Sequence, residues 1–305
     1  MGAEIRADGL VMTYGDVRAV DGVSFTVAPG EFFGLLGPNG AGKTTTLEMV
    51  EGLRKPQAGS VRIDQYEPWK REPALQRRMG VQLQSSSFFE RLTAREQLDT
   101  FGALYGVAAG RTDEMLEQVG LVDKADVRTE DLSGGQKQRL SIACALIHDP
   151  DVVFLDEPTA ALDPQARRNL WDVLRSINDS GRTVILTTHY LDEAEALCDR
   201  VAIMDSGKIL ELDTPAALIR GLDAPVRISL APGTLDVGVA RDIANGDAVT
   251  HEPEVDGDGA LTITTRDPSR ILTELARRDA LAGLSVKGAS LEDVFLELTG
   301  REYRA

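Results

Sequence analysis

The feature that most limits how this chain can fold is a glycine-rich segment, Gly37–Thr45, which reads Gly-Pro-Asn-Gly-Ala-Gly-Lys-Thr-Thr. It contains the pattern G-x-x-x-x-G-K-[ST], whose defining positions are filled by Gly37, Gly42, Lys43 and Thr44. The pattern binds phosphate only between a strand and a helix, because the helix start supplies the backbone N–H groups. The alternative is a glycine-rich turn that caps an ordinary helix, so the flanking sequence decides.

The sequence on both sides of this segment favours the order strand, loop, helix. Residues 32–36 form a short apolar run typical of a buried strand, and residues 45–51 suit a helix. Glycine at three loop positions lets successive N–H groups converge on phosphate oxygens. We expect Lys43 to reach the terminal phosphates and the Thr44 hydroxyl to ligate Mg²⁺. The predicted phosphate-binding residues are Gly37, Pro38, Asn39, Gly40, Ala41, Gly42, Lys43, Thr44 and Thr45.

Composition and charge disfavour several classes of partner. At 305 residues the chain is long enough for two domains, and its charge of −16 disfavours a nucleic-acid partner, which needs clustered Lys and Arg. The same charge disfavours direct adhesion to an anionic membrane. No signal pattern is visible and no apolar run approaches the roughly eighteen residues of a membrane span, so we expect a cytoplasmic protein. Cys144 and Cys198 fit no metal or redox spacing and are predicted to be reduced core thiols.

An aromatic residue near the N-terminus, Tyr14, is open to two interpretations. Residues 5–36 alternate apolar and polar in short runs broken by turn residues, which predicts a small antiparallel sheet. Tyr14 is then either a strand-end residue that packs at a turn, or a platform for a purine ring, worth about 1 to 3 kcal/mol. Residues 59–64 and 79–84 are predicted as further strands.

A helical insertion is predicted after these strands. Thr93 with Glu96 forms a capping box at the start of a helix that runs to about Tyr105. A second helix is expected at about residues 112–119. We therefore expect the stretch 85–131 to be an all-helical insertion between elements of a sheet.

A second helix start with open N–H groups is predicted at Leu132–Arg139, which reads Leu-Ser-Gly-Gly-Gln-Lys-Gln-Arg. Ser133 suits the N-cap position of this helix. The paired glycines, Gly134 and Gly135, would leave N–H groups open to a second anion. On its own this start would be an ordinary capped helix.

Two apolar strands end in residues suited to phosphate chemistry. Residues 151–158 form a continuous apolar strand that ends in Asp156 and Glu157. Asp156 fits a Mg²⁺ ligand and Glu157 fits the base that orients an attacking water; the alternative is two solvated acids. Residues 183–188 form another strand, and the following His189 is placed either to contact a terminal phosphate or to serve a structural role.

Together these residues resemble the nucleotide-binding subunit of an ATP-binding cassette (ABC) transporter, over residues 4 to about 220. The most specific element is Leu132–Arg139, which is similar to the family signature and precedes the acidic strand in the expected order. The resemblance implies an α/β P-loop NTPase fold with a mixed-sheet core, an antiparallel β subdomain and an α-helical subdomain. It also implies a competent ATPase with ATP and Mg²⁺ as cofactors.

The resemblance implies roles for single residues as well. Tyr14 would stack on adenine, Asp163 would be the D-loop aspartate, and His189 the switch histidine. Gln84 would link Mg²⁺ to the permease contact, with Gln82 as the weaker alternative. The predicted sets are catalytic Glu157, His189 and Gln84; metal-binding Thr44, Gln84 and Asp156; and, beyond the phosphate loop, ATP-binding Tyr14, Ser133, Gly134, Gly135, Gln136 and Asp163.

The family arrangement explains why the chain carries two anion-binding helix starts. In this family two subunits pair head to tail, so that Ser133, Gly134 and Gly135 of one grip the ATP held by the other. We therefore expect a homodimer to be required for hydrolysis. We also expect a separate integral membrane permease as partner, which would place the chain at the cytoplasmic face of the membrane.

The pattern changes from about Gly221, and we divide the chain into domains at 1–220 and 221–305. The second is predicted to be a small α+β domain with strands at 226–230, 248–254, 260–264 and 283–287 and a helix at 269–280. A final apolar stripe forms either the core of this domain or a contact with a dimer partner or other protein. The stripe consists of Leu291, Val294, Phe295 and Leu298.

Residues 291–300 are similar to the end of drug- and antibiotic-exporter cassettes of the daunorubicin-resistance type. The resemblance implies export by a separate permease. An importer motor, which differs mainly in its C-terminal domain, is the first alternative. A soluble cassette ATPase that acts on DNA or ribosomes is the second; those relatives usually carry coiled-coil insertions, tandem cassettes or basic linkers.

Overall fold

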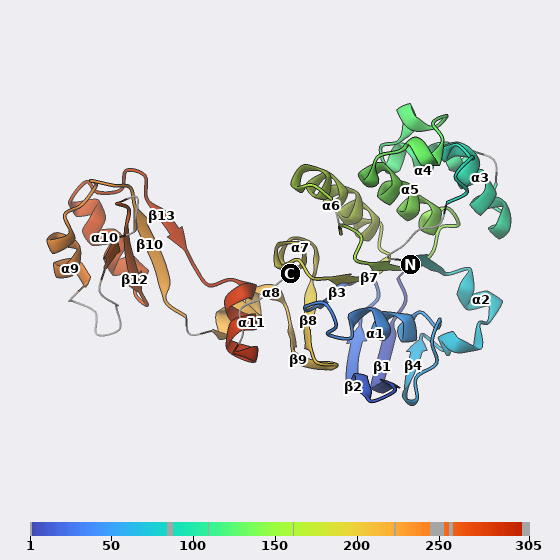
Figure 1. The fold of residues 1–305 in the computed structure, drawn as a ribbon, viewed down its shortest axis with the longest axis horizontal. Coiled ribbons are helices and arrows are strands. Elements are labelled where there is room, and N and C mark those ends of the chain that lie inside the picture. Colours follow the sequence, from blue (N-terminus) through green and yellow to red (C-terminus); the bar gives the residue numbers. More distant parts are fainter. Residues whose placement is uncertain are drawn as a thin grey trace. The chain divides into compact units, whose positions relative to one another are not determined.

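The computed structural model describes residues 2–83, 88–108, 110–160, 162–222, 224–244, 253–255 and 259–300. The chain divides into two compact units, between Pro215 and Ala216 (Figure 1). The first unit contains strands β1 Ile5–Tyr14, β2 Val17–Val27, β3 Phe32–Leu36, β4 Ala58–Ile63, β5 Met79–Gln82, β6 Val152–Asp156, β7 Thr183–Thr188, β8 Arg200–Asp205 and β9 Lys208–Asp213. Its α-helices are α1 Lys43–Val50, α2 Pro73–Gln76, α3 Ala94–Tyr105, α4 Arg111–Gln118, α5 Gly134–Leu146, α6 Pro164–Asp179 and α7 Leu191–Leu197, with 3₁₀ turns at Pro68–Lys70, Val122–Lys124 and Thr129–Asp131.

The centre of the first unit is a six-stranded sheet in the order β5-β6-β7-β3-β8-β9. Its strands run parallel except β9, which pairs antiparallel with β8. Every residue of β3, β6 and β7 is buried, because the sheet is covered on both faces. These are the continuous apolar runs that the sequence predicted as strands.

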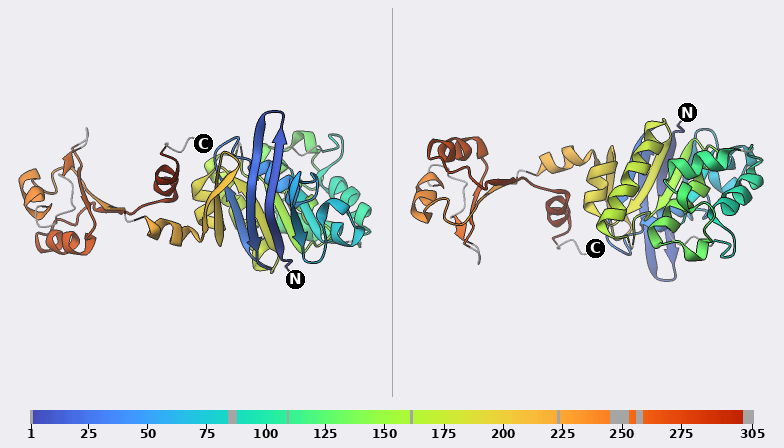
Figure 2. Two further views of the ribbon diagram at one scale, coloured as in Figure 1. Left: turned by 90° about the horizontal axis from the view of Figure 1, so that it is seen from below. Right: turned by 90° about the horizontal axis from the view of Figure 1, so that it is seen from above.

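A three-stranded antiparallel sheet, in the order β2-β1-β4, covers one face of the central sheet. Helix α1 packs between the two sheets, against β1, β2 and β4 on one side and β6 and β7 on the other. One hydrophobic cluster joins these layers, including Phe33, Leu47, Met49, Phe154 and Val61. The helices drawn in green and yellow-green lie on the opposite face of the central sheet (Figure 2). The phosphate loop, residues 37–45, is thus anchored at both ends in this layered core, by β3 before it and α1 after it.

The helices α3, α4 and α5 pack on one another as a group. The predicted capping box is confirmed: the Thr93 side chain accepts from the Glu96 backbone N–H and the Glu96 carboxylate accepts from the Thr93 N–H. The group is larger than the predicted insertion 85–131, because α5 packs against both α3 and α4. Within the described residues, no helix is both long and apolar enough to cross a bilayer.

The two cysteines behave as the sequence predicted. Cys144 and Cys198 are both buried free thiols. Burial raises the pKa of Cys144 to about 12 and that of Cys198 well above its ordinary value. Both side chains therefore act as small core residues.

The second unit has the element order βαββαβ, followed by one more helix. After α8 Pro215–Gly221 come β10 Val226–Leu230, α9 Val237–Ala244, β11 Glu254–Val255, β12 Leu261–Thr265, α10 Pro268–Arg277, β13 Ser285–Lys287 and α11 Leu291–Thr299. The antiparallel sheet has the order β11-β12-β10-β13, which is the ferredoxin-like arrangement. Helices α9 and α10 complete its core, which includes Ile228, Ile263, Ile243 and Leu275.

Helix α9 was not predicted from the sequence. Its valines and Gly238 favour neither a helix nor a strand strongly, whereas the structure buries Ala240, Ile243 and Ala244 together on one face. The predicted strand at 248–254 falls largely outside the described residues. Of the predicted apolar stripe, Leu291, Val294 and Phe295 are buried, but they do not belong to the hydrophobic cluster of this sheet.

Candidate active site

The site is built at the carboxyl edge of the central sheet, where the neighbouring parallel strands β6, β7 and β3 end. In register, Asp156 lies beside Thr187 and Leu36 lies beside Thr188. The loops that leave these strands carry the phosphate loop, Glu157 and His189. Residues far apart in the sequence therefore meet at one edge, as the rule for ligand sites in open parallel sheets predicts.

The phosphate loop, residues 37–45, requires glycine for two physical reasons. Gly42 has φ of 98°, a left-handed conformation that favours glycine, and it is the N-cap of α1. A Cβ atom at Gly42 would lie 2.3 Å from the backbone oxygen of Ala19, and one at Gly37 would lie 2.3 Å from that of Met204. The loop therefore packs backbone against backbone, and the first N–H groups of α1 have no partner within the helix.

Lys43 is a buried cation that is held by its own loop. Its side chain is 4% exposed, and Nζ donates to the carbonyl oxygens of Gly37 (2.8 Å) and Pro38 (3.1 Å). Nζ also lies 3.4 Å from Oε1 of Glu157. Burial lowers the pKa of Lys43, and the attraction of Glu157 opposes that shift. A partly compensated cation of this kind gains electrostatic stabilisation when an anion enters the loop.

Asp156 and Thr44 form a pair of adjacent oxygen donors. The Thr44 hydroxyl donates to Asp156 Oδ1 at 3.1 Å, and the Thr187 hydroxyl donates to the same oxygen at 2.5 Å. Burial raises the pKa of Asp156, and the two hydroxyl hydrogen bonds lower it. A carboxylate and a hydroxyl beside a phosphate-binding loop form the donor set that Mg²⁺ prefers, so these residues fit that ion.

Glu157 sits in an unusual backbone conformation that directs its carboxylate. Its φ is 47°, in the left-handed region, which costs on the order of 1–3 kcal/mol for a residue other than glycine. Its N–H donates to the backbone oxygen (3.2 Å) and the hydroxyl (3.0 Å) of Thr187. Glu157 Oε2 lies 3.0 Å from Nδ1 of His189, so with the carboxylate ionised the imidazole donates from Nδ1.

The alternative of two solvated acids at this strand end is wrong. Asp156 is 4% exposed, and the Glu157 side chain is 8% exposed. Glu157 lies between Lys43 on one oxygen and His189 on the other. The structure therefore joins these four residues and the phosphate loop in one centre.

Two other predicted positions, Tyr14 and Gln82, make no contact with this centre that the structure describes. Tyr14 ends β1, is 42% exposed and carries the Arg54 guanidinium 5.2 Å from its ring centroid; no contact described for it reaches the phosphate loop. Gln84 falls outside the described residues. Gln82 ends β5, is 1% exposed and donates from Nε2 to the Leu83 oxygen at 2.5 Å, which makes it a buried strand residue.

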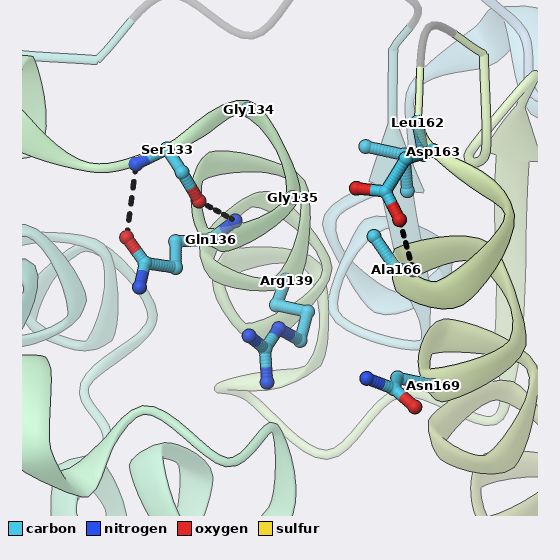
Figure 3. A pocket seen from close by; sticks show the side chains of 9 residues that line it. All are labelled: Ser133, Gly134, Gly135, Gln136, Arg139, Leu162, Asp163, Ala166 and Asn169. Carbon is cyan, nitrogen blue, oxygen red and sulfur yellow. Dashed lines mark hydrogen bonds between the residues drawn. The ribbon is translucent and has the colours of Figure 1, made fainter.

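The predicted signature residues line a cavity of about 230 Å³ that is separate from the phosphate-loop centre, and we call it the second cavity (Figure 3). Ser133 caps α5: its hydroxyl accepts from the Gln136 N–H, and its own N–H donates to Gln136 Oε1. Asp163 caps α6 on the facing side by accepting from Ala166 N–H at 2.9 Å. The lining residues are Ser133, Gly134, Gly135, Gln136, Arg139, Leu162, Asp163, Ala166 and Asn169, and none of them belongs to the phosphate-loop centre.

Sequence reasoning missed part of this second cavity. Arg139 lines it and donates from Nη1 to the carbonyl oxygens of Val119 and Gly120, both at 3.3 Å, which fixes α5 to the end of α4. Ala166 and Asn169 line it from α6. Helical spacing was the available signal, because Arg139 lies three residues after Gln136 and Asn169 three residues after Ala166.

Comparison with known proteins agrees with this geometry. Residues 20–160 match the ABC transporter family. The chain is 41% identical to Nod factor export ATP-binding protein I of Paraburkholderia xenovorans (strain LB400), over 98% of both chains. It is 36% identical to the linearmycin resistance ATP-binding protein LnrL of Bacillus subtilis (strain 168), over 98% of this chain and 99% of that protein.

Solved structures show the same fold. An ATP-binding subunit of an ABC transporter superposes with a TM-score of 0.64 at 28% identity, over 71% of this chain and 92% of that one. An ATP-binding cassette in its ADP conformation has a TM-score of 0.63 at 24% identity, over 70% of this chain and 92% of that one. The chain therefore belongs to the ABC transporter family, as an ATP-binding subunit and an ATPase that powers transport.

Proposed function

We propose that this chain is the motor subunit of an ABC exporter and drives a separate membrane permease. The observation that carries the proposal is the meeting of the phosphate loop, Asp156, Glu157 and His189 at one sheet edge. The names of two relatives of matching length, one for Nod factor export and one for linearmycin resistance, support export over import. The transported compounds would be drugs, antibiotics or other hydrophobic molecules.

ATP binding is assigned to the phosphate loop and to Tyr14. The N–H groups of the loop and of the first turn of α1 would hold the phosphates, and Lys43 would exchange its loop carbonyl partners for the terminal phosphates. Thr44 and Asp156 would hold Mg²⁺, with Gln84 as the third predicted ligand, and the ion would neutralise phosphate charge. Tyr14, with Arg54 already against its ring, would stack on adenine.

Hydrolysis is assigned to Glu157 and His189. The Glu157 carboxylate would accept the proton of the attacking water as general base. His189 donates from Nδ1 to that carboxylate and so holds it in one orientation. The strained backbone at Glu157 serves the same end, because it fixes where the carboxylate points.

A head-to-tail homodimer accounts for the second cavity. Within one chain, Ser133, Gly134 and Gly135 line a cavity that shares no residue with the phosphate loop. The start of α5 there presents backbone N–H groups, which suit the phosphates of an ATP molecule held by another copy. Gln136 contributes through the capping box that shapes this helix start, and Asp163 through the facing α6.

The contact with the permease is assigned to an apolar groove, which we define by Leu83, Phe88, Phe101, Tyr105 and His148. The groove has a volume of about 330 Å³ and lies between β5, α3 and α5. Beside it on the surface Phe89 is 59% exposed and Leu104 is 76% exposed. Exposed apolar surface of this kind marks an interaction site. Gln84 lies in the sequence between two groove residues, so the groove and the proposed Mg²⁺ ligand are connected through the chain.

The assignment is tested by sedimentation of the full-length chain with membranes, with and without its co-expressed partner permease. We expect membrane association only when the permease is present, and we expect the Phe101→Asp variant to lose this association. Leu281→Asp changes an exposed apolar residue of the second unit, 46% exposed, and serves as the matched control. Sedimentation with membranes in the absence of the permease would contradict the proposed function. A Phe101→Asp variant that binds ATP and still sediments with the permease would contradict the assignment of the groove.

A further inference from the structure

The feature that points beyond these roles is the ring of Tyr190, which follows His189 directly. The imidazole of His189 and the ring of Tyr190 lie with centroids 4.1 Å apart and planes inclined by 42°. The guanidinium carbon of Arg167 lies 4.3 Å from the centroid of the same ring. The Tyr190 ring therefore contacts both the side chain that touches Glu157 and a cation on helix α6.

The backbone of Tyr190 is fixed as well. Its N–H donates to the Thr188 hydroxyl at 2.9 Å, and it is the N-cap residue of α7. Arg167 also pairs with Asp192 of α7 at 3.6 Å, and its side chain is only 17% exposed. A cation–π contact removed from water in this way is worth more than one on an open surface.

A second tie between α6 and α7 lies next to the first. The indole N–H of Trp171 donates to Glu193 Oε1 at 3.1 Å, and Glu193 is fully buried. Arg167 and Trp171 are four residues apart and therefore share one face of α6. Helix α6 is thus joined to the segment that carries His189 at two points, one turn apart.

The adjacent face of α6 lines the second cavity. Ala166 and Asn169 line that cavity, and the helix begins at the Asp163 cap beside it. One rigid helix therefore borders the second cavity on one face and holds the Tyr190 ring on another. Tyr190 is the link between this helix and the Glu157–His189 pair.

We propose that Tyr190 is a positioning residue for ATP hydrolysis. Its ring, between Arg167 and His189, holds the imidazole against Glu157 and ties this pair to helix α6. The inference rests on the proposed roles of Glu157 and His189. Because no contact described for Tyr190 reaches the phosphate loop, its effect falls on turnover and not on ATP binding.

The test compares kcat and KM for ATP of the purified full-length chain. Tyr190→Leu removes the aromatic face, and we expect kcat to fall about tenfold with KM within about twofold. Tyr190→Phe keeps the ring and should restore kcat to within about twofold of the wild type. Rescue by Phe separates ring positioning from a role of the phenol group or from general disruption of the fold.

The Arg167 side of the contact is tested independently, so the proposal remains testable if the Tyr190→Leu variant fails to fold. We expect Arg167→Gln to lower kcat about three- to tenfold, in line with a cation–π contact, and to add little in the Tyr190→Leu background. Arg168→Gln removes an exposed charge at the next position of α6 and should leave kcat unchanged.

The outcomes distinguish this inference from the proposed function. Wild-type kcat in folded Tyr190→Leu, equal losses in the Phe and Leu variants, or independent multiplicative effects of Arg167→Gln and Tyr190→Leu would overturn the positioning role. If Glu157→Gln, measured in the same assay, keeps full turnover, the assignment of the base fails. Loss of turnover in Glu157→Gln beside a normal Tyr190→Leu rejects this inference alone.

Discussion

Replacing Glu157 by Gln tests the chemistry at the centre of the site. The change keeps the length of the side chain. It also keeps an oxygen that can accept a hydrogen bond from His189 Nδ1, which lies 3.0 Å from Glu157 Oε2, but it removes the group that accepts a proton. Loss of a general base lowers turnover by about 10²- to 10⁴-fold, equivalent to roughly 3–5 kcal/mol in the activation barrier. The left-handed backbone is occupied by a non-glycine residue in both forms, so the change adds no new strain there.

ATP binding should respond differently to the same change. Glu157 Oε1 lies 3.4 Å from Lys43 Nζ, and the loss of its negative charge frees this cation for phosphate. We therefore expect Glu157→Gln to bind ATP as tightly as the wild type or more tightly, and to accumulate as an ATP-bound dimer. Weakened ATP affinity would mean that the carboxylate supports binding instead of hydrolysis.

The assay is single-turnover release of phosphate, with equilibrium titration of ATP and sedimentation in the presence of Mg²⁺ and ATP. Glu195→Gln, which neutralises an exposed acid on α7, is the matched control and should behave as the wild type. Turnover of Glu157→Gln within about twofold of the wild type would refute the assignment of Glu157 as the base.

Three further predictions concern other parts of the first unit. Lys43→Ala loses a charge-assisted contact of about 1.5–3 kcal/mol, so titration should show ATP affinity about 10- to 100-fold weaker. Gly135→Asp adds a negative charge to the second cavity. Sedimentation should therefore show that ATP-promoted dimerisation is lost, while each single chain still binds ATP. Glu51 is 6% exposed, and burial raises its pKa from 4.5 to about 8. Between pH 4.5 and about pH 8 the folded state therefore binds a proton that the unfolded state has released, so the free energy of unfolding falls as the pH rises through this range. Glu51→Gln should flatten that decline in thermal unfolding between pH 5 and pH 8, by roughly a kcal/mol per pH unit; an unchanged slope would show that Glu51 titrates normally.

Much of the site could be predicted because its signals are local. The pattern that ends in Lys43 and Thr44 fixes a loop geometry, and the N-cap at Ser133 and the capping box at Thr93 each mark a helix start within four residues. The apolar strands before Glu157 and His189 indicate a buried parallel sheet, and the rule for such sheets brings their ends together.

What could not be predicted depends on contacts between distant segments. The left-handed conformation of Glu157 is imposed by hydrogen bonds to Thr187 of the neighbouring strand, and nothing in the local sequence requires it. The contact of Tyr190 with Arg167 needs the packing of α6 on α7. Helix α9 has weak intrinsic propensity and is fixed by the sheet it covers, so tertiary burial decides it.

The strand order of the second unit has a consequence for how that unit is attached. Its first strand, β10, and its last, β13, are direct neighbours, with Arg227 opposite Lys287. The polypeptide therefore enters and leaves this sheet side by side, at the start of β10 and the end of β13. Because neighbouring strands lie about 5 Å apart, a short flexible linker in place of residues 226–287 would still join α8 to α11.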